Sequence, residues 1–126
     1  MNSTSKQIIV RPTSSDDVRE YHLTGAKITD QPYAEFFSPL YGSETDFEFL
    51  GEQGQELADA LMDKAHEKMI SRVTIRPNSV KVYKSPTADW ATVERNVVIK
   101  ALQSTFGNEF KPIQYGSTKF REVAFA

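Results

Sequence analysis

The 126-residue chain contains no cysteine. This absence excludes a disulfide scaffold, a thiol nucleophile, a cysteine-ligated zinc site and an iron–sulfur cluster held by thiolates of this chain. Long apolar runs are missing too: none reaches membrane-spanning length, and the polar residues 1–6 are followed by no hydrophobic signal core. We therefore expect a soluble cytoplasmic protein with no membrane partner.

An excess of charge of one sign is also lacking. The 15 basic and 17 acidic residues leave a formal net charge of -2. A global attraction toward nucleic acid is therefore absent, although the total charge does not report how charge is distributed over the surface. The hydrophobic fraction of 39% and the charged fraction of 25% are ordinary for a globular protein, and the length predicts a single domain over residues 1–126.

Two echoing segments predict β-hairpins. Residues 75–79 read Ile-Arg-Pro-Asn-Ser, and residues 10–14 read Val-Arg-Pro-Thr-Ser. Each copy sets a proline at the second position of a tight turn, where its fixed φ suits a type I or II turn. The flanks alternate apolar and polar residues, which is the period of a half-buried strand. The expected strands are Gln7–Val10 and Val18–Leu23, with a longer connection between them, and Ser71–Ile75 and Ser79–Lys84.

Two helices are expected from apolar residues that recur with a period of 3.6. The first, Gln55–Met69, has one apolar face, made of Leu57, Ala58, Leu61, Met62, Ala65 and Met69. The second begins after Asp89, which stands in the N-cap position, and ends at Gly107. Its apolar face consists of Trp90, Val93, Val97, Ala101, Leu102 and Phe106.

The remaining segments are less regular. Residues 26–54 combine glycine and proline with six aromatic residues, which predicts a packed irregular segment with a helical turn near Tyr33–Phe37. Residues 108–126 form a tail, which we expect to be an edge strand or an ordered tail. Within it, Lys119–Phe125 has weak strand character. The order β-β-α-β-β-α predicts an α+β two-layer sandwich, with two helices on one face of an antiparallel sheet of two β-hairpins.

Residues typical of catalysis or metal binding form no convincing group. His22 and His66 are the only histidines, and neither has a second ligand at helix or loop spacing. Asp59 and Asp63 share a helix face that reads as a solvated charged side, and the two glycines at 51 and 54 lack the Lys-Ser/Thr of a phosphate loop. We predict no catalytic residue, no metal site and no cofactor, and hence no enzyme.

The second hairpin provides a candidate interaction surface, made of Arg72, Arg76, Lys81 and Tyr83, and Arg11 and Lys84 are further cations that can gather on the same face. Basic and aromatic side chains together are typical of single-stranded nucleic-acid binding, so a nucleic-acid or small-ligand binding module is one alternative. Outward-facing charge on a strand is also the ordinary way in which a sheet avoids aggregation. A second candidate surface is the aromatic segment Tyr33–Phe49, which either lines a ligand groove or covers the core.

The chain resembles the N-terminal domain of the Nfu/NifU-like iron–sulfur scaffold proteins over about residues 8–106. The resemblance rests on a strand, turn and strand over residues 8–25, on Ser38-Pro39-Leu40, and on the helix with Leu57 and Leu61. The second half matches better, with Val80-Lys81-Val82 followed by Asp89-Trp90 at the start of the last helix. In that family, cluster chemistry belongs to a separate domain with a Cys-x-x-Cys motif. The resemblance therefore implies a protein-interaction domain that serves iron–sulfur assembly through a partner protein.

Overall fold

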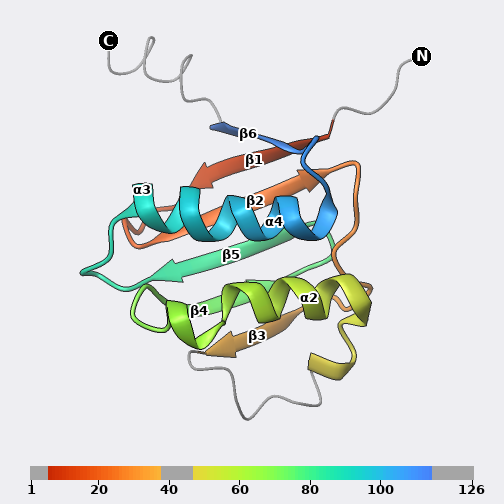
Figure 1. Cartoon of the computed structure of the whole chain (residues 1–126), viewed down its shortest axis with the longest axis horizontal. Coiled ribbons are helices and arrows are strands. Elements are labelled where there is room, and N and C mark those ends of the chain that lie inside the picture. Colours follow the sequence, from red (N-terminus) through yellow and green to blue (C-terminus); the bar gives the residue numbers. More distant parts are fainter. Residues whose placement is uncertain (1–5, 38–46, 115–126) are drawn as a thin grey trace.

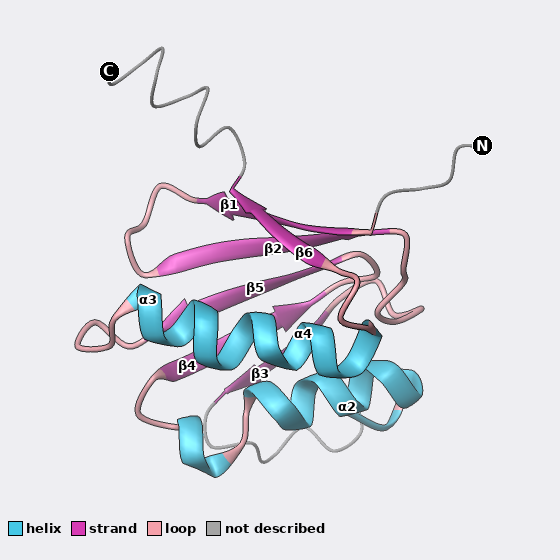
Figure 2. Cartoon of the chain, turned by 45° about the horizontal axis from the view of Figure 1, so that its top comes forward, coloured by secondary structure: helices cyan, strands magenta, loops and turns pink. Residues whose placement is uncertain are grey.

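The computed structural model describes residues 6–37 and 47–114 and has an α+β fold, as predicted. A six-stranded sheet carries its helices on one face (Figures 1 and 2). The strands are β1 (Gln7–Pro12), β2 (Val18–Thr24), β3 (Ala34–Phe37), β4 (Ile70–Ile75), β5 (Ser79–Lys84) and β6 (Lys111–Gln114). The helical elements are α2 (Gly51–Leu61), the 3-10 turn η1 (Lys64–His66), and a last helix made of α3 (Trp90–Thr92), the π-helical η2 (Val93–Val98) and α4 (Ile99–Phe106).

The two predicted hairpins form the centre of the sheet. The strand order is β3-β4-β5-β2-β1-β6, with β1 antiparallel to β2, β4 antiparallel to β5, and β2 and β5 joining the two hairpins. Two further strands extend the sheet, and β6 runs parallel to β1, so the sheet is mixed rather than wholly antiparallel. The predicted tail thus contributes an edge strand at Lys111–Gln114, while Lys119–Phe125 lies outside the described residues.

The prediction of a helical turn near Tyr33–Phe37 is wrong, because Ala34–Phe37 is the edge strand β3. Ala34 and Phe36 are buried, while Glu35 and Phe37 point to the opposite side, which is the two-residue alternation of a strand. The strand pairs with β4 over its whole length, with Phe36 opposite Val73. Pairing with a strand that lies far along the chain therefore decides the conformation of this segment.

The two proline turns differ. In the second, Pro77 and Asn78 are the central residues of a tight turn from Arg76 to Ser79, and the Arg76 amide donates to the Ser79 carbonyl at 2.9 Å. Asn78 does not have a positive φ, which fits a type I turn. The first copy does not make the expected tight turn, because Pro12 is the last residue of β1 and pairs with Arg19. Proline is tolerated at a strand end, where its missing N–H is not needed.

The first helix is shorter than predicted at its C-terminal end and begins earlier. It starts at Gly51, ends at Leu61 and buries Leu57, Ala58 and Leu61. The Asp63 carboxylate accepts a hydrogen bond from the Ala65 amide at 2.8 Å, and η1 begins immediately afterwards. Because such a side-chain bond offers the backbone an alternative to the helix, the apolar period continues past the point where the helix stops.

The ends predicted for the last helix are confirmed. The Asp89 carboxylate accepts from the Thr92 amide at 3.2 Å, as an N-cap does, and Gly107 follows the final turn with a φ of 128°. Between these ends, residues Val93–Val98 adopt a π-helical conformation, which the sequence pattern does not indicate. Such turns are rare and are frequent at functional sites.

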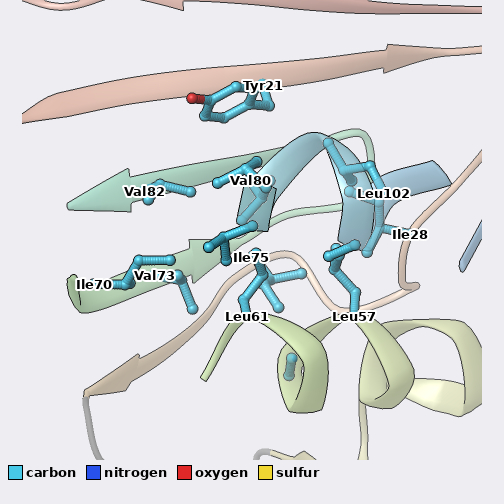
Figure 3. Packing of buried hydrophobic residues seen from close by; sticks show 14 of the residues in the cluster. Tyr21, Ile28, Leu57, Leu61, Ile70, Val73, Ile75, Val80, Val82 and Leu102 are labelled. Atoms are coloured by element: carbon cyan, nitrogen blue, oxygen red, sulfur yellow. The ribbon is translucent and has the colours of Figure 1, made fainter. Parts of the chain in front are cut away.

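The hydrophobic core fills the space between the sheet and the helices. Figure 3 shows Val80 of β5 and Ile75 of β4 facing Leu61 of α2 and Leu102 of α4, and all four side chains are fully buried. The two helices pack side by side over the strands (Figure 1). Burying an aliphatic side chain of this kind stabilises the fold by about 1.5–3 kcal/mol. In the described part of the chain, no helix is long and apolar enough to span a membrane.

Candidate functional site

The face of the sheet opposite α2 and α4 is the candidate site, and we call it the open face. Within the described residues, no helix packs on it (Figure 2). Strand register determines which side chains it carries, because partners directly opposite each other on paired strands share a face. Its members are Gln7, Ile9, Arg11, Val18, Glu20, His22, Thr24, Glu35, Phe37, Arg72, Thr74, Ser79, Lys81, Tyr83, Lys111 and Ile113.

Arg72 lies at the centre of one end of the open face. Its guanidinium carbon is 4.0 Å from the ring centroid of Tyr83 on β5 and 5.5 Å from that of Phe37 on β3. Its Nε atom is 2.7 Å from Glu35 Oε2, an ion pair without the alignment of a hydrogen bond. Three strands thus hold one arginine between two aromatic rings and a carboxylate, an arrangement in which cation–π attraction contributes about 0.5–1 kcal/mol.

Glu20 occupies the middle of the open face among cations. Its Oε1 atom is 2.9 Å from His22 Nε2, its Oε2 atom is 3.7 Å from Lys81 Nζ, and Arg11 is its cross-strand partner on β1. The hydrogen bond with His22 is the main cause that lowers the pKa of Glu20, with further lowering from Lys81 and Arg11 against the opposing effect of burial. Glu20 is therefore a carboxylate at neutral pH.

The structure brings three of the four predicted surface residues together. Arg72, Lys81 and Tyr83 share the open face, with Arg72 directly opposite Tyr83. Arg76 lies at the rim, where its guanidinium carbon is 5.7 Å from the exposed ring of Tyr33. The hairpin surface and the aromatic segment, which the sequence presents as separate candidates, therefore adjoin through Phe37 and Tyr33. The part of that segment over residues 38–46 lies outside the described residues.

Sequence reasoning missed the acidic members of the open face. Glu35 is absent from the predicted surface because a helical turn is expected near Tyr33–Phe37, and only the alternation of Ala34–Phe37 indicates a strand that places it beside Arg72. Lys84 was expected with the other hairpin cations, but it points to the helical side. There its Nζ atom donates to Asp17 Oδ1 at 2.8 Å. The open face is thus less basic than the hairpin sequence indicates.

Neither histidine sits in a metal-binding group of the described residues. No set of three or more His, Asp or Glu side chains converges there. His22 is bonded to Glu20, whereas the Nδ1 atom of His66 in η1 is buried with no hydrogen-bond partner among the described residues. The residues that the structure describes hold no ligand set of the kind that structural zinc requires.

A partly buried polar cluster lies on the helical side of the sheet. Glu94 of η2 accepts from the Tyr21 hydroxyl at 2.9 Å and from Arg19 Nη1 at 2.6 Å. Burial, followed by the charge and the hydrogen bond of Glu94, raises the pKa of Tyr21. Trp90 stacks with Arg19 at 4.6 Å and donates its indole N–H to the Asp16 carbonyl. Every polar group named here has a partner, so the cluster fastens the last helix to the sheet.

A shallow depression of about 460 Å³ lies beside the start of α2. Carboxylates dominate its charged lining, which includes Lys27, Asp30, Glu52 and Glu56. Lys27 and Asp30 are bound to each other at 2.9 Å and are both well exposed. The depression therefore lacks the apolar, enclosed character of a small-molecule site.

Comparison with known proteins adds one distant likeness. No family model and no curated protein matches the chain. Among solved structures, the crystal structure of protein SAV1430 from Staphylococcus aureus is similar with a TM-score of 0.44 at 12% identity, over 79% of this chain and 98% of that chain. This likeness is too distant to bear on what the chain does. The Nfu resemblance stays a prediction.

Proposed function

We propose that the chain is a non-catalytic protein-interaction domain that binds a partner protein through its open face. The placement of Arg72 between Phe37 and Tyr83 carries this proposal. Arginine and aromatic side chains are enriched at protein interfaces and supply most of the binding free energy there. Phe37 is 53% exposed, so much of its surface is left for a partner to cover.

The open face is also organised before binding. Its side chains stand on paired strands, and Glu35 holds the Arg72 side chain in place. Ordering a long side chain at an interface costs about 0.5–1.5 kcal/mol, and the part of this cost already met in the free protein does not oppose binding. A preformed sheet surface therefore favours recognition of a folded partner.

The resemblance to the Nfu N-terminal domain makes proteins of iron–sulfur assembly the first partners to examine. Because the chain has no cysteine, its part in that process would be to bind a protein rather than a cluster. We propose the same cytoplasmic location that the sequence predicts. The alternative of a nucleic-acid or small-ligand module is weaker, since Glu20 and Glu35 lie among the cations that would meet a polyanion.

Site-directed photo-cross-linking tests this proposal. A benzoylphenylalanine at position 37 replaces an exposed phenylalanine on the open face, and the same residue at position 49 replaces an exposed phenylalanine outside the sheet. We expect position 37 to capture a defined protein in cells, position 49 not to capture it, and Arg72→Glu to abolish its capture. Identical products from both positions, or capture that survives Arg72→Glu, would contradict a partner site on the open face.

A further inference from the structure

The strands of the open face carry a charge opposite in sign to that of the whole chain. Four cations, Arg11, Arg72, Lys81 and Lys111, face two carboxylates, Glu20 and Glu35. With His22 neutral, the strand residues of this face therefore have a net charge of +2, whereas the chain has a net charge of -2. Arg76 adds a further cation at the rim, beside Tyr33. Among the other described residues, acidic side chains outnumber basic ones.

From this charge we infer that the partner of the open face is a protein surface rich in Asp and Glu, an inference that rests on the proposed function. Complementary potentials steer association and fix the register of two surfaces, while like charges disfavour wrong partners. A cationic face on an acidic protein also determines which side of the protein a charged partner approaches. An acidic partner is attracted to the sheet and repelled by the rest of the molecule.

Lys81 is placed to receive a carboxylate near the middle of the open face. Its Nζ atom lies 3.7 Å from Glu20 Oε2, which is longer than a hydrogen bond, and its side chain keeps 26% of its surface exposed. An incoming carboxylate can therefore bind Lys81 without breaking a hydrogen bond to Glu20. At the other end, the exposed ring of Phe37 offers apolar contact next to Arg72.

The two carboxylates favour an acidic protein over nucleic acid. Glu20 lies between Lys81 and Arg11, and Glu35 lies against Arg72, so these three cations each have a fixed negative charge beside them. The phosphates of a nucleic acid follow one another at regular spacing and would meet these carboxylates. A protein surface can set a donor opposite Glu20 and carboxylates opposite the cations.

Titration of the isotope-labelled full chain with defined peptides tests the inference. The probes are oligoglutamate, oligolysine and oligothymidylate of equal length, followed by amide chemical shifts at low and at physiological salt. We expect oligoglutamate to shift amides of β2, β4 and β5, with an affinity that falls at least threefold when salt screens the exposed charges. Arg11→Glu combined with Lys81→Glu should weaken this binding by at least tenfold.

A matched variant separates the effect of the open-face cations on binding from the effect of the net charge of the chain. Lys68→Glu combined with Lys100→Glu makes the same change in net charge at two exposed positions off the sheet, and it should leave oligoglutamate binding within twofold. Equal loss in both double variants, absence of binding, or tighter binding of oligothymidylate to the same strands would overturn the inference. Thermal unfolding of each variant confirms that it is folded.

The outcomes also distinguish this inference from the proposed function. Capture of a partner through position 37 that is lost in Arg72→Glu but unchanged in the Arg11/Lys81 double variant would leave an interaction surface whose partner is not acidic. Capture that is unchanged in both variants would contradict the proposed function itself. Loss in both, together with selective binding of oligoglutamate, supports both statements.

Discussion

The Tyr21 hydroxyl donates a hydrogen bond of 2.9 Å to the Glu94 carboxylate, which joins the central strand β2 to the π-helical turn of the last helix. Tyr21 is fully buried, and Figure 3 shows its ring above Val80 in the core. The same Glu94 oxygen accepts from Arg19, so one carboxylate receives two donors from alternate residues of a strand. A buried tyrosine of this kind combines apolar packing with a polar attachment.

Removing the Tyr21 hydroxyl should therefore destabilise the protein without opening the core. We expect Tyr21→Phe to lower the free energy of unfolding by about 1–2 kcal/mol, because it deletes a hydrogen bond to a charged acceptor that keeps its Arg19 partner. Urea denaturation measures this change. Tyr33→Phe is the matched control: its ring is 52% exposed, and the change should stay within about 0.5 kcal/mol of zero.

Alkaline pH should act on the same residue. The pKa of Tyr21 is raised above its ordinary value of about 10, chiefly by burial and then by the negative charge of Glu94. Above pH 10 the unfolded chain can release this proton while the folded chain keeps it, so the stability gained from the shift is lost as pH rises. Urea unfolding from pH 8 to 11 should show a smaller decline for Tyr21→Phe than for the wild type, and equal slopes would refute this account.

Acid pH should act through Glu20. The pKa of its carboxylate is lowered, first by the hydrogen bond with His22 and then by Lys81 and Arg11. The resulting stability is present above the unfolded pKa of about 4.3 and disappears as pH falls through the lower folded value. Glu20→Gln should flatten the fall in unfolding free energy between about pH 5 and pH 3. Asp59→Asn on the exposed side of α2 serves as control and should keep the wild-type slope.

The hairpins and the ends of the last helix could be predicted because their signals are local. Alternation around Pro77, the N-cap at Asp89 and the glycine at 107 each act within a few residues. The strand β3 could not be predicted in the same way, since Ala34–Phe37 is too short for its period to stand out among glycine, proline and aromatic residues. Its partner β4 lies more than 30 residues further along the chain.

Local signals also misplaced the start of α2. Gly54 was expected before the helix, because glycine costs about 1 kcal/mol in a helix interior. In the structure Gly54 lies within α2, and a Cβ atom there would come within 2.8 Å of the Leu50 Cβ and 3.3 Å of the Ile28 carbonyl oxygen. Close packing against Leu50 in the preceding turn and against the Ile28 carbonyl of a distant segment, which the sequence pattern does not reveal, explains this glycine.

The sequence predicts the basic residues of the candidate site, but it does not predict the carboxylates that lie beside them. Arg72 and Tyr83 are brought together by the register of a hairpin that the sequence predicts. Glu35 reaches Arg72 from β3, and Glu20 reaches Lys81 from the other hairpin, so both depend on which strands become neighbours. Strand order is a property of the whole fold, and the paired carboxylates could not be read from the second hairpin alone.

The buried ion pair between Lys84 and Asp17 can be tested by mutation. Lys84 is expected from the sequence on the same face as the other hairpin cations, but it is buried on the helical side. Only 7% of its side chain is exposed, and its Nζ atom binds Asp17 Oδ1 at 2.8 Å and the Ser85 carbonyl at 3.2 Å. Removing one partner of a buried charge leaves the other without compensation, which costs more than the pair itself contributes. Because Asp17 is partly exposed, we expect Asp17→Asn to lower the free energy of unfolding by about 1–2 kcal/mol.

Two further variants isolate the buried charge as the cause. Asp30→Asn breaks the exposed pair with Lys27 and should change the free energy of unfolding by no more than about 0.5 kcal/mol. Adding Lys84→Met to Asp17→Asn removes the stranded charge while keeping an apolar side chain in its place, so the double variant should be more stable than Asp17→Asn alone. A double variant that is less stable than Asp17→Asn would show that Lys84 stabilises the fold through contacts other than Asp17, including the ring of Trp90 at 5.9 Å.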